Sequence, residues 1–529
     1  MDPMPGAKLV EKGMHRIILK PTGVEVSAPS GSPLRNPLFE QGVEFPCGGQ
    51  GRCRGCRIQV LEGQVQVNAA QRGQLSPDEL AHGWRLACQC SVEGDLVIEL
   101  RQWDAAILAD ETPFDFEPRP GLGVAVDVGT TTIVAQLLDL QTGSVLAVRT
   151  ALNSQGRHGA DVMSRIEYAL SPGGLDELQH LIRRQVGALV RQLLLAARTP
   201  GQAVRNVVLV GNTVMHHLFS GIDVEPLSHF PFVPNRAGLE VFNAGELEWD
   251  LPSGVPVRFL PCLGGFVGSD ILAGLLATRM GESEDLIALI DLGTNGEIVL
   301  GNRERILCAS TAAGPAFEGA RVSMGMRASA GAISQVELED GRVKCHVLGN
   351  IEAKGLCGSG LVDAVAAGLD LGIILPSGRF ADARSEWTLA PAVALTQSDV
   401  RELQLAKAAI ASGLQLLREQ WGGADPVRLY LAGAFGNYVN RSRARRIGLI
   451  NYPPDQIQPA GNTALLGAKL ALFGSDGVDG PGEEVGSYHA LRRRVEHVSL
   501  SADPHFQDVF VQELGFSESA HNYQEEVAL

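Results

Sequence analysis

Short runs of alternating apolar and polar residues dominate the first hundred positions. Residues 15–19 and 24–28 form two such runs on either side of a turn, and this pattern predicts a β-hairpin. Residues 57–61 and 96–100 predict two further strands, and Pro77 with the acidic residues after it predicts a helix start. The pattern therefore predicts a small unit of strands wrapped around one short helix.

From residue 121 onward the pattern changes to buried strands that alternate with helices. Apolar residues recur at helical spacing between 178 and 193, and a continuous apolar run at 207–210 predicts the next strand. A capping box at 396–399 predicts the start of another helix, and a strand is expected after it at 427–431. This alternation is typical of α/β domains.

The same strand, turn and strand pattern occurs twice in this second part. One copy runs from a buried strand through Asp127, Gly129 and the threonines at 130–132, and the other runs through Asp291 and Gly293. Turn amides and hydroxyls can hold a phosphate, and an aspartate at the strand end lies where Mg²⁺ and its waters would be placed. An ordinary β-hairpin would explain either copy alone. Two copies far apart in the chain indicate duplicated halves that face each other across a cleft.

The two parts are separated by a stretch with three prolines and no strand or helix period, which predicts a tether. A chain of 529 residues is too long for one hydrophobic core. We expect five parts, an N-terminal domain, a linker, two α/β halves and a C-terminal extension packed on them: 1–101, 102–120, 121–281, 282–475 and 476–529.

Cysteines give the first part its candidate chemistry. Cys47, Cys53 and Cys56 lie within ten residues, among glycines and arginines, and Cys88 follows after a long gap. This spacing fits a [2Fe–2S] cluster with four thiolate ligands, with a first gap one residue longer than in the plant-type pattern. A structural zinc site remains an alternative, although it prefers two short ligand pairs. A disulfide framework is the other, although the chain shows no secretory context.

Composition and charge narrow the class of protein. A formal net charge of −16 argues against nucleic acid or an anionic membrane as a partner. The first thirteen residues lack the apolar core of a signal peptide. The apolar stretch at 355–375 contains aspartates and glycines, which predicts a buried helix instead of a membrane span. We therefore expect a cytoplasmic protein.

Strands around one short helix, with the cysteine loop at an edge, resemble the β-grasp ferredoxin domain. The Leu-Ala-Cys sequence that ends at Cys88 resembles the ferredoxin pattern around the fourth ligand. The resemblance therefore implies Cys88 as the ligand and leaves Cys90 as a small buried residue. The remaining cysteines have no ligand spacing, and we expect no second cluster among Cys262, Cys308, Cys345 and Cys357.

The duplicated turns resemble the superfamily of actin, the sugar kinases and the heat-shock ATPases, in which two ribonuclease H-like halves clamp ATP. Residues 127–131 and 291–294 resemble its phosphate motifs, 431–436 its adenosine motif, and the helices beginning near 269 and 462 its connecting helices. The resemblance implies ATP and Mg²⁺, with Asp127 and Asp291 as catalytic carboxylates and Glu297 as a further candidate for placing the cation. It also implies nucleotide contacts by Gly129, Thr130, Thr131, Asp270, Gly293, Thr294, Asn295, Gly433, Gly436 and Asn437.

A [2Fe–2S] ferredoxin joined to this ATPase fold resembles the reductive activators of corrinoid-dependent enzymes. Four further stretches resemble that family, at 153–166, 211–217, 358–363 and 431–438, with Ser154 at a position where proline is expected. The resemblance implies ATP-dependent, one-electron reduction of a Co(II) corrinoid to Co(I). It also implies a corrinoid protein as acceptor and a low-potential electron donor. We expect no nucleic acid or membrane partner, and a homodimer is possible.

Two other functions stay open at this point. The chain could donate electrons to another low-potential enzyme such as a dehydratase, although those activators hold their cluster between subunits without a ferredoxin domain. It could also be a redox-sensing protein whose nucleotide site signals without turnover. For His216 and His217 we expect packing or capping in preference to cobalt binding or proton transfer.

Overall fold

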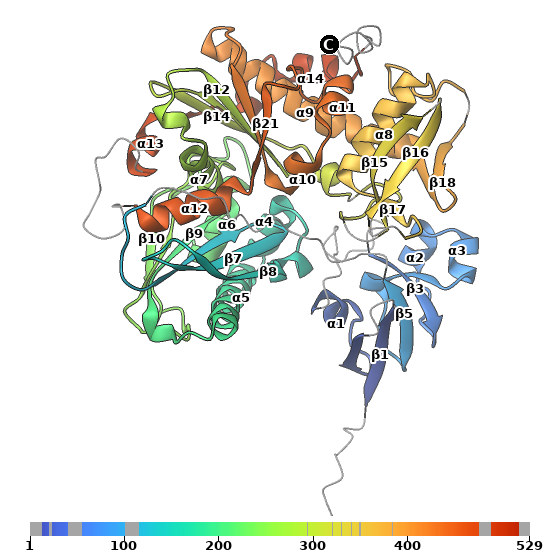
Figure 1. Cartoon of the computed structure of the whole chain (residues 1–529). Helices are drawn as coiled ribbons and strands as arrows, with labels where there is room; N and C mark the ends of the chain where they lie inside the picture. Colours follow the sequence, from blue (N-terminus) through green and yellow to red (C-terminus); the bar gives the residue numbers. More distant parts are fainter. Residues whose placement is uncertain are drawn as a thin grey trace, which may run out of the picture. The chain divides into compact units, whose positions relative to one another are not determined.

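The computed structural model describes residues 13–20, 24–40, 56–100, 116–293, 295–319, 321–328, 331–339, 341–348, 351–382, 384–474 and 488–517 (Figure 1). The chain divides into two compact units. One comprises residues 1–104 with 156–160, and the other comprises 105–155 with 161–529. Within the described ranges, no helix has the length and apolar character needed to cross a membrane.

The first unit is a five-stranded sheet in the order β2-β1-β5-β3-β4, with short helices around it (Figure 1). β1 pairs antiparallel with β2 and parallel with β5, and β3 joins β5 to β4 through antiparallel pairs. This is the predicted β-grasp architecture. The elements are β1 (Met14–Lys20), β2 (Val24–Pro29), α1 (Arg35–Glu40), β3 (Arg57–Glu62), α2 (Ala69–Gln74), α3 (Pro77–Ala81), β4 (Trp84–Leu86) and β5 (Leu96–Leu100).

The expectation of one short helix in this unit is wrong, because its described residues form three α-helices. The predicted helix is α3, and Ser76 caps it by accepting the backbone N–H of Glu79, whose carboxylate accepts the N–H of Ser76. α1 and α2 have six residues each. Helices this short do not complete two turns, so they leave no apolar periodicity in the sequence.

The second unit contains two six-stranded sheets of similar topology (Figure 1). In each, three antiparallel strands in sequence order are followed, beside the first of them, by a parallel strand. The first sheet has the order β10-β11-β9-β6-β7-β8, with β6 (Leu122–Val128), β7 (Thr132–Asp139), β8 (Val145–Leu152), β9 (Val204–Val210), β10 (Glu240–Asn243) and β11 (Pro256–Phe259). The second has the order β21-β20-β12-β13-β14-β22, with β12 (Ile287–Leu292), β13 (Gly296–Gly301), β14 (Ile306–Thr311), β20 (Arg428–Ala432), β21 (Ile457–Gly461) and β22 (Val495–His497).

Helices cover both sheets and connect them. α7 and α12 are the two predicted connecting helices, and they pack so closely that a Cβ on Gly467 would lie 2.0 Å from the carbonyl oxygen of Ala273. An apolar core that includes Ile271, Leu289 and Leu465 therefore joins the two halves. The helices of the first half are α4 (Val162–Ala169), α5 (Gly174–Ala197), α6 (Thr213–Ser220) and α7 (Ser269–Thr278); those of the second half are α8 (Gly358–Asp370), α9 (Gln397–Trp421), α10 (Gly433–Tyr438), α11 (Arg441–Arg446) and α12 (Thr463–Phe473).

The second half carries two small sheets and C-terminal elements that sequence patterning did not predict. The sheets have the orders β16-β15-β17 and β18-β19, and near the C-terminus β22 extends the large sheet by pairing parallel with β14. A buried ion pair of 3.2 Å between Lys407 and Glu513 also links α9 to the C-terminal residues. The elements are β15 (Ala332–Glu339), β16 (Arg342–Val347), β17 (Gly355–Leu356), β18 (Glu386–Ala390), β19 (Val393–Thr396), α13 (Tyr488–Arg494) and α14 (Phe506–Gln512).

Candidate functional site

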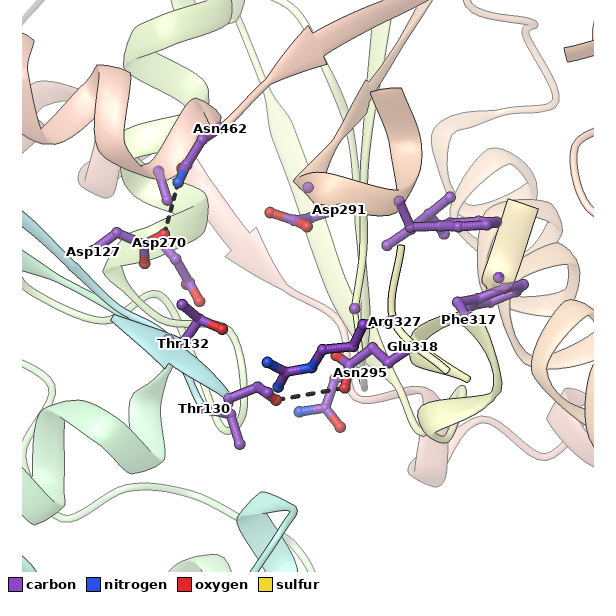
Figure 2. Close-up of a pocket in the computed structure, with 18 of the residues that line it drawn as sticks. Asp127, Thr130, Thr132, Asp270, Asp291, Asn295, Phe317, Glu318, Arg327 and Asn462 are labelled. Carbon is purple, nitrogen blue, oxygen red and sulfur yellow. Dashed lines mark hydrogen bonds between the residues drawn. The ribbon is translucent and has the colours of Figure 1, made fainter. Parts of the chain in front are cut away.

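The second unit encloses a cavity of about 310 Å³, a size that suits a small-molecule ligand (Figure 2). Both predicted phosphate turns line it, together with the starts of α7, α8, α10 and α12. The predicted site residues that line the cavity are Asp127, Gly129, Thr130, Thr131, Asp270, Asp291, Gly293, Asn295 and Gly433.

Three other predicted site residues are not placed in the cavity wall. Gly436 packs behind the wall, where a Cβ would lie 3.2 Å from the carbonyl carbon of Leu431. Thr294 lies outside the described residues, and the side chain of Asn437 is not described. Nine of the twelve predicted nucleotide and catalytic residues therefore lie in the described cavity wall, and their roles stay predictions.

Side chains from three later segments hold the first turn. The amide of Asn153 donates to the carbonyl oxygen of Gly129 at 2.9 Å, and that of Asn212 donates to the Thr130 hydroxyl at 2.7 Å. The buried guanidinium of Arg165 donates to the Thr130 carbonyl oxygen. Because burial removes water from Arg165, its pKa falls to about 9. The stretches at 153–166 and 211–217 therefore support the turn that begins at Asp127.

The backbone at Gly433 approaches the second turn so closely that only glycine fits there. Asp291 is the penultimate residue of β12 and lies beside Ala432 of the parallel strand β20, so Gly433 follows directly next to the carboxylate. Gly433 has φ of +82°, and a Cβ there would lie 2.7 Å from Oδ1 of Asp291. Asp127 occupies the equivalent place in the first half, beside Val210 of β9. The duplication thus places one strand-end aspartate in each half.

Four carboxyl groups of the cavity wall have strongly shifted pKa values: Asp127, Asp270, Asp291 and Glu297. Burial raises the pKa of Asp127 to about 7, that of Asp270 to about 8 and that of Asp291 to about 6. The pKa of Glu297 is also raised well above its ordinary value, by burial and by the charges of Asp270 and Asp291. Asn462 partly offsets the shift at Asp127 by donating to Oδ2 at 3.0 Å. Carboxyl groups with raised pKa values lack nearby positive charge, so these four suit a ligand that arrives with a bound cation.

The carboxyls do not form a ready cage for a metal. Within the part of the chain that the structure describes, no group of three or more His, Cys, Asp or Glu side chains has the geometry to hold a metal ion. Magnesium usually keeps several waters and binds through one or two carboxylates together with substrate phosphates. The donor set therefore fits Mg²⁺ held mainly by a nucleotide.

The opposite wall contains residues that sequence reasoning missed. The rings of Phe317 and Phe435 stack with centroids 4.7 Å apart, which gives the cavity an apolar face. Glu318 reaches across from the second half and accepts a hydrogen bond from the Thr131 hydroxyl at 3.5 Å (Figure 2). Arg327 extends from the same side toward the first turn (Figure 2). No local motif surrounds these residues, because their role depends on where distant segments meet.

In the first unit, the structure describes two of the four predicted cluster ligands. Cys56 and Cys88 are 1% and 9% exposed, and the backbone N–H of Ala87 donates to the carbonyl oxygen of Cys56 at 3.0 Å. Cys47 and Cys53 lie outside the described residues. The backbone bond brings the end of the cysteine loop next to the turn that carries Cys88. Two thiols held in this way fit the predicted [2Fe–2S] ligand set.

The neighbouring Cys90 has a different environment. Its thiol donates to the carbonyl oxygen of Leu86 at 3.0 Å, so it carries a proton. Burial, with a smaller contribution from Cys56, raises the pKa of Cys90 to about 12. Cys90 is therefore a small buried residue with a hydrogen bond of its own.

His216 and His217 are buried on α6 and bond to backbone. His216 Nε2 lies 3.1 Å from the carbonyl oxygen of Gly238, and His217 Nδ1 lies 2.8 Å from that of Thr213. Burial lowers the pKa of His216 to about 3 and that of His217 to about 4, so both imidazoles are neutral at physiological pH. These contacts agree with the packing role expected for the pair.

Three protein families match consecutive parts of the chain. Residues 17–93 match the 2Fe-2S iron-sulfur cluster binding domain. Residues 122–283 match the family described as the RACo middle region, and residues 285–528 match the C-terminal domain of RACo, the ASKHA domain. The matched families support a [2Fe–2S] cluster in the first unit and nucleotide binding in the second.

Relatives that match about three quarters of the chain are also found. The corrinoid activation enzyme RamQ of Eubacterium limosum is 34% identical over 442 residues, which cover 78% of this chain and 73% of the relative. The [Co(II) methylated amine-specific corrinoid protein] reductase of Methanosarcina barkeri is 27% identical over 432 residues, covering 74% and 77% of the two chains. The solved structure of a reductive activator for corrinoid, iron-sulfur protein aligns with a TM-score of 0.67 and 27% identity, covering 95% of this chain and 98% of that chain.

Proposed function

The chain belongs to the family of corrinoid reductive activators, and from this premise we propose that it couples ATP to the reduction of a corrinoid protein. In the reaction, one electron from a low-potential donor converts Co(II) of the partner's corrinoid to Co(I). The observation that carries this function is the presence, in one chain, of a ferredoxin-type thiol pair and a nucleotide cavity between duplicated aspartate turns. Neither feature alone would name the acceptor.

The first unit supplies the electron-carrying group. Cys56 and Cys88, with Cys47 and Cys53, would hold a [2Fe–2S] cluster, which carries one electron at a time when bound. The residues around it do two things. The Ala87 N–H ties the backbone of Cys56 to the residue before Cys88, and Cys90, whose thiol bonds to the Leu86 carbonyl oxygen, would stay outside the ligand set.

The second unit supplies the driving force. Every tenfold change in the equilibrium of a one-electron transfer corresponds to about 59 mV, so a step uphill by ~0.2 V would cost roughly 5 kcal/mol. Nucleotide bound between the two halves can meet that cost if it favours a complex in which the corrinoid is more easily reduced. This is a shift of population through differential affinity, and release of the nucleotide products then frees the reduced partner.

The carboxylates of the cavity have a proposed role in this reaction. Asp127 and Asp291, with Asp270 and Glu297 nearby, would orient Mg²⁺ and the attacking water, since they surround the cavity at the ends of both phosphate turns. A low-potential electron donor, a possible homodimer and a cytoplasmic location stay predictions from the sequence.

The alternative of a redox sensor predicts nucleotide binding without turnover. A direct experiment mixes the reduced chain with ATP, Mg²⁺ and a Co(II) corrinoid protein, and follows the absorption bands of Co(II) and Co(I). We expect Co(I) to appear only when ATP is present, and ATP hydrolysis to rise when the corrinoid protein is added. Binding of ATP without hydrolysis, in the presence of the partner, would support the sensor instead.

Gly433 offers a geometric test of the nucleotide cavity. We expect Gly433→Ala to weaken ATP binding by about tenfold or more, because the new methyl group would overlap Asp291 and the backbone would be strained at φ of +82°. Isothermal titration measures the change. Gly422→Ala is the matched control, since Gly422 also has a positive φ of +111° but no atom within 4 Å of its Cβ position. Equal losses in both variants would show that backbone strain, and not the contact with Asp291, is responsible.

A further inference from the structure

Acidic side chains far outnumber basic ones in the wall of the nucleotide cavity. Five carboxyl side chains contribute to its described wall, at Asp127, Asp270, Asp291, Glu297 and Glu318. Arg327 is the single lysine or arginine among the described residues that line the cavity. A nucleoside triphosphate brings several negative charges, and Mg²⁺ neutralises only part of them. A second source of positive charge is therefore needed beside the phosphates.

Arg327 extends toward the first predicted phosphate turn (Figure 2). Figure 2 shows its side chain reaching from the second half toward Thr130 and Thr132 of the first turn, next to Glu318. The guanidinium stays cationic at neutral pH although burial lowers its pKa to about 10. An arginine can make two parallel hydrogen bonds to phosphate oxygens, which favours phosphate over a point-like partner.

A pinched loop places Arg327 and Glu318 side by side. Gly319 and Gly325 approach so closely that a Cβ on Gly325 would lie 1.8 Å from the carbonyl oxygen of Gly319. Gly319 has φ of +75°, and its own Cβ would lie 2.6 Å from the carbonyl oxygen of Met326. The residues that flank this loop, Glu318 and Arg327, are thereby brought together at the cavity.

The loop is also anchored to the rest of the second half. The backbone N–H of Ser323 donates to Oδ1 of the buried Asp399 at 2.6 Å, and the N–H of Met326 donates to the carbonyl oxygen of Leu356 at 2.8 Å. Leu356 ends β17, directly before the start of α8 that lines the cavity. The backbone that carries Arg327 is therefore fixed before a ligand arrives, which reduces the entropy cost of binding.

We propose that Arg327 binds the terminal phosphate of ATP, and that Glu318 competes with this phosphate for the hydroxyl of Thr131. The proposal rests on the nucleotide-binding part of the proposed function and adds the residues that distinguish ATP from ADP. When the terminal phosphate is present, it accepts bonds from Arg327 and Thr131, and the Glu318 carboxylate moves away from the like charge. ADP lacks this group and leaves the contact between Thr131 and Glu318 in place.

The test compares the binding of ADP and of a non-hydrolysable ATP analogue to the full chain by isothermal titration. We expect Arg327→Gln to weaken binding of the ATP analogue by about ten- to a hundredfold, and to change ADP binding by less than about threefold. Arg327→Lys should recover part of the loss, since it restores the charge without the planar fork. Glu318→Gln should tighten the ATP analogue relative to ADP, because it removes a negative charge beside the terminal phosphate.

Arg321→Gln is the matched control, because Arg321 lies on the same loop but is exposed. It should leave both affinities unchanged. Equal loss of ADP and ATP-analogue binding in Arg327→Gln, or no loss, would overturn the proposal, and so would an unchanged preference in Glu318→Gln. Failure of the unsubstituted chain to bind ATP would instead contradict the nucleotide-dependent function itself. The visible cluster spectrum and thermal unfolding of each variant report whether the fold is retained.

Discussion

Replacing Asp291 by asparagine lowers ATP turnover by about a hundredfold or more and leaves the visible absorption of the iron–sulfur cluster unchanged; this is the result we expect. Asp291 lies near the end of β12 at the nucleotide cavity, and burial raises its pKa only to about 6, which leaves it largely ionised at neutral pH. Asparagine keeps the size of the side chain and removes only the charge that would orient Mg²⁺ and water. The four predicted cluster ligands belong to the other compact unit, so we expect the substitution to leave the cluster unchanged.

The expected result is checked by measuring phosphate release and the absorption spectrum on the same preparation. Asp382→Asn is a suitable control, because Asp382 is an exposed carboxylate paired with Arg384 and does not line the cavity. Turnover that survives in Asp291→Asn would remove this carboxylate from the catalytic set. Simultaneous loss of the cluster absorption would show that the two units do not have separable roles.

Sequence patterning predicted the part of the site that repeats. Asp127 and Asp291 each end a continuous apolar strand before a Gly-Thr turn, so local sequence alone indicated both, and the duplication indicated that they face the same cavity. Glu318 and Arg327 could not be predicted in this way. Glu318 ends a four-residue 3-10 helix and Arg327 lies in no helix or strand, and they meet at the cavity because Gly319 and Gly325 close the loop between them.

The fold shows the same division between local and distant information. The helix predicted to begin at 396–399 is α9, and its capping box has the expected reciprocal bonds, with the Thr396 hydroxyl accepting the Asp399 N–H at 3.3 Å. The six-residue helices α1 and α2 were missed because their stability comes from packing on the sheet instead of from their own sequence. The strand β22 was missed because three residues are too few to show a strand pattern, and they form a strand only by pairing with β14.

Cys88 is the predicted fourth ligand of the cluster, and its replacement should remove the cluster. We expect Cys88→Ala to abolish the visible absorption and the electron paramagnetic resonance signal of the reduced cluster, because a [2Fe–2S] site requires four ligands. Reduction of the corrinoid protein should be lost with the cluster. ATP binding should persist, since the nucleotide cavity lies wholly in the other unit. Persistence of ATP binding separates loss of the cluster from loss of the whole fold.

Cys90→Ala is the matched control, two residues away and equally conservative in size. Cys90 is 4% exposed, and its protonated thiol donates to the Leu86 carbonyl oxygen, so its removal should cost about 1 kcal/mol of stability and leave the cluster spectrum intact. The reverse outcome, with the spectrum lost in Cys90→Ala and kept in Cys88→Ala, would exchange the two assignments. It would require Cys90 to give up its hydrogen bond to the Leu86 carbonyl oxygen. The bound cluster would have to supply that free energy, whereas Cys88 already lies beside the segment that carries Cys56.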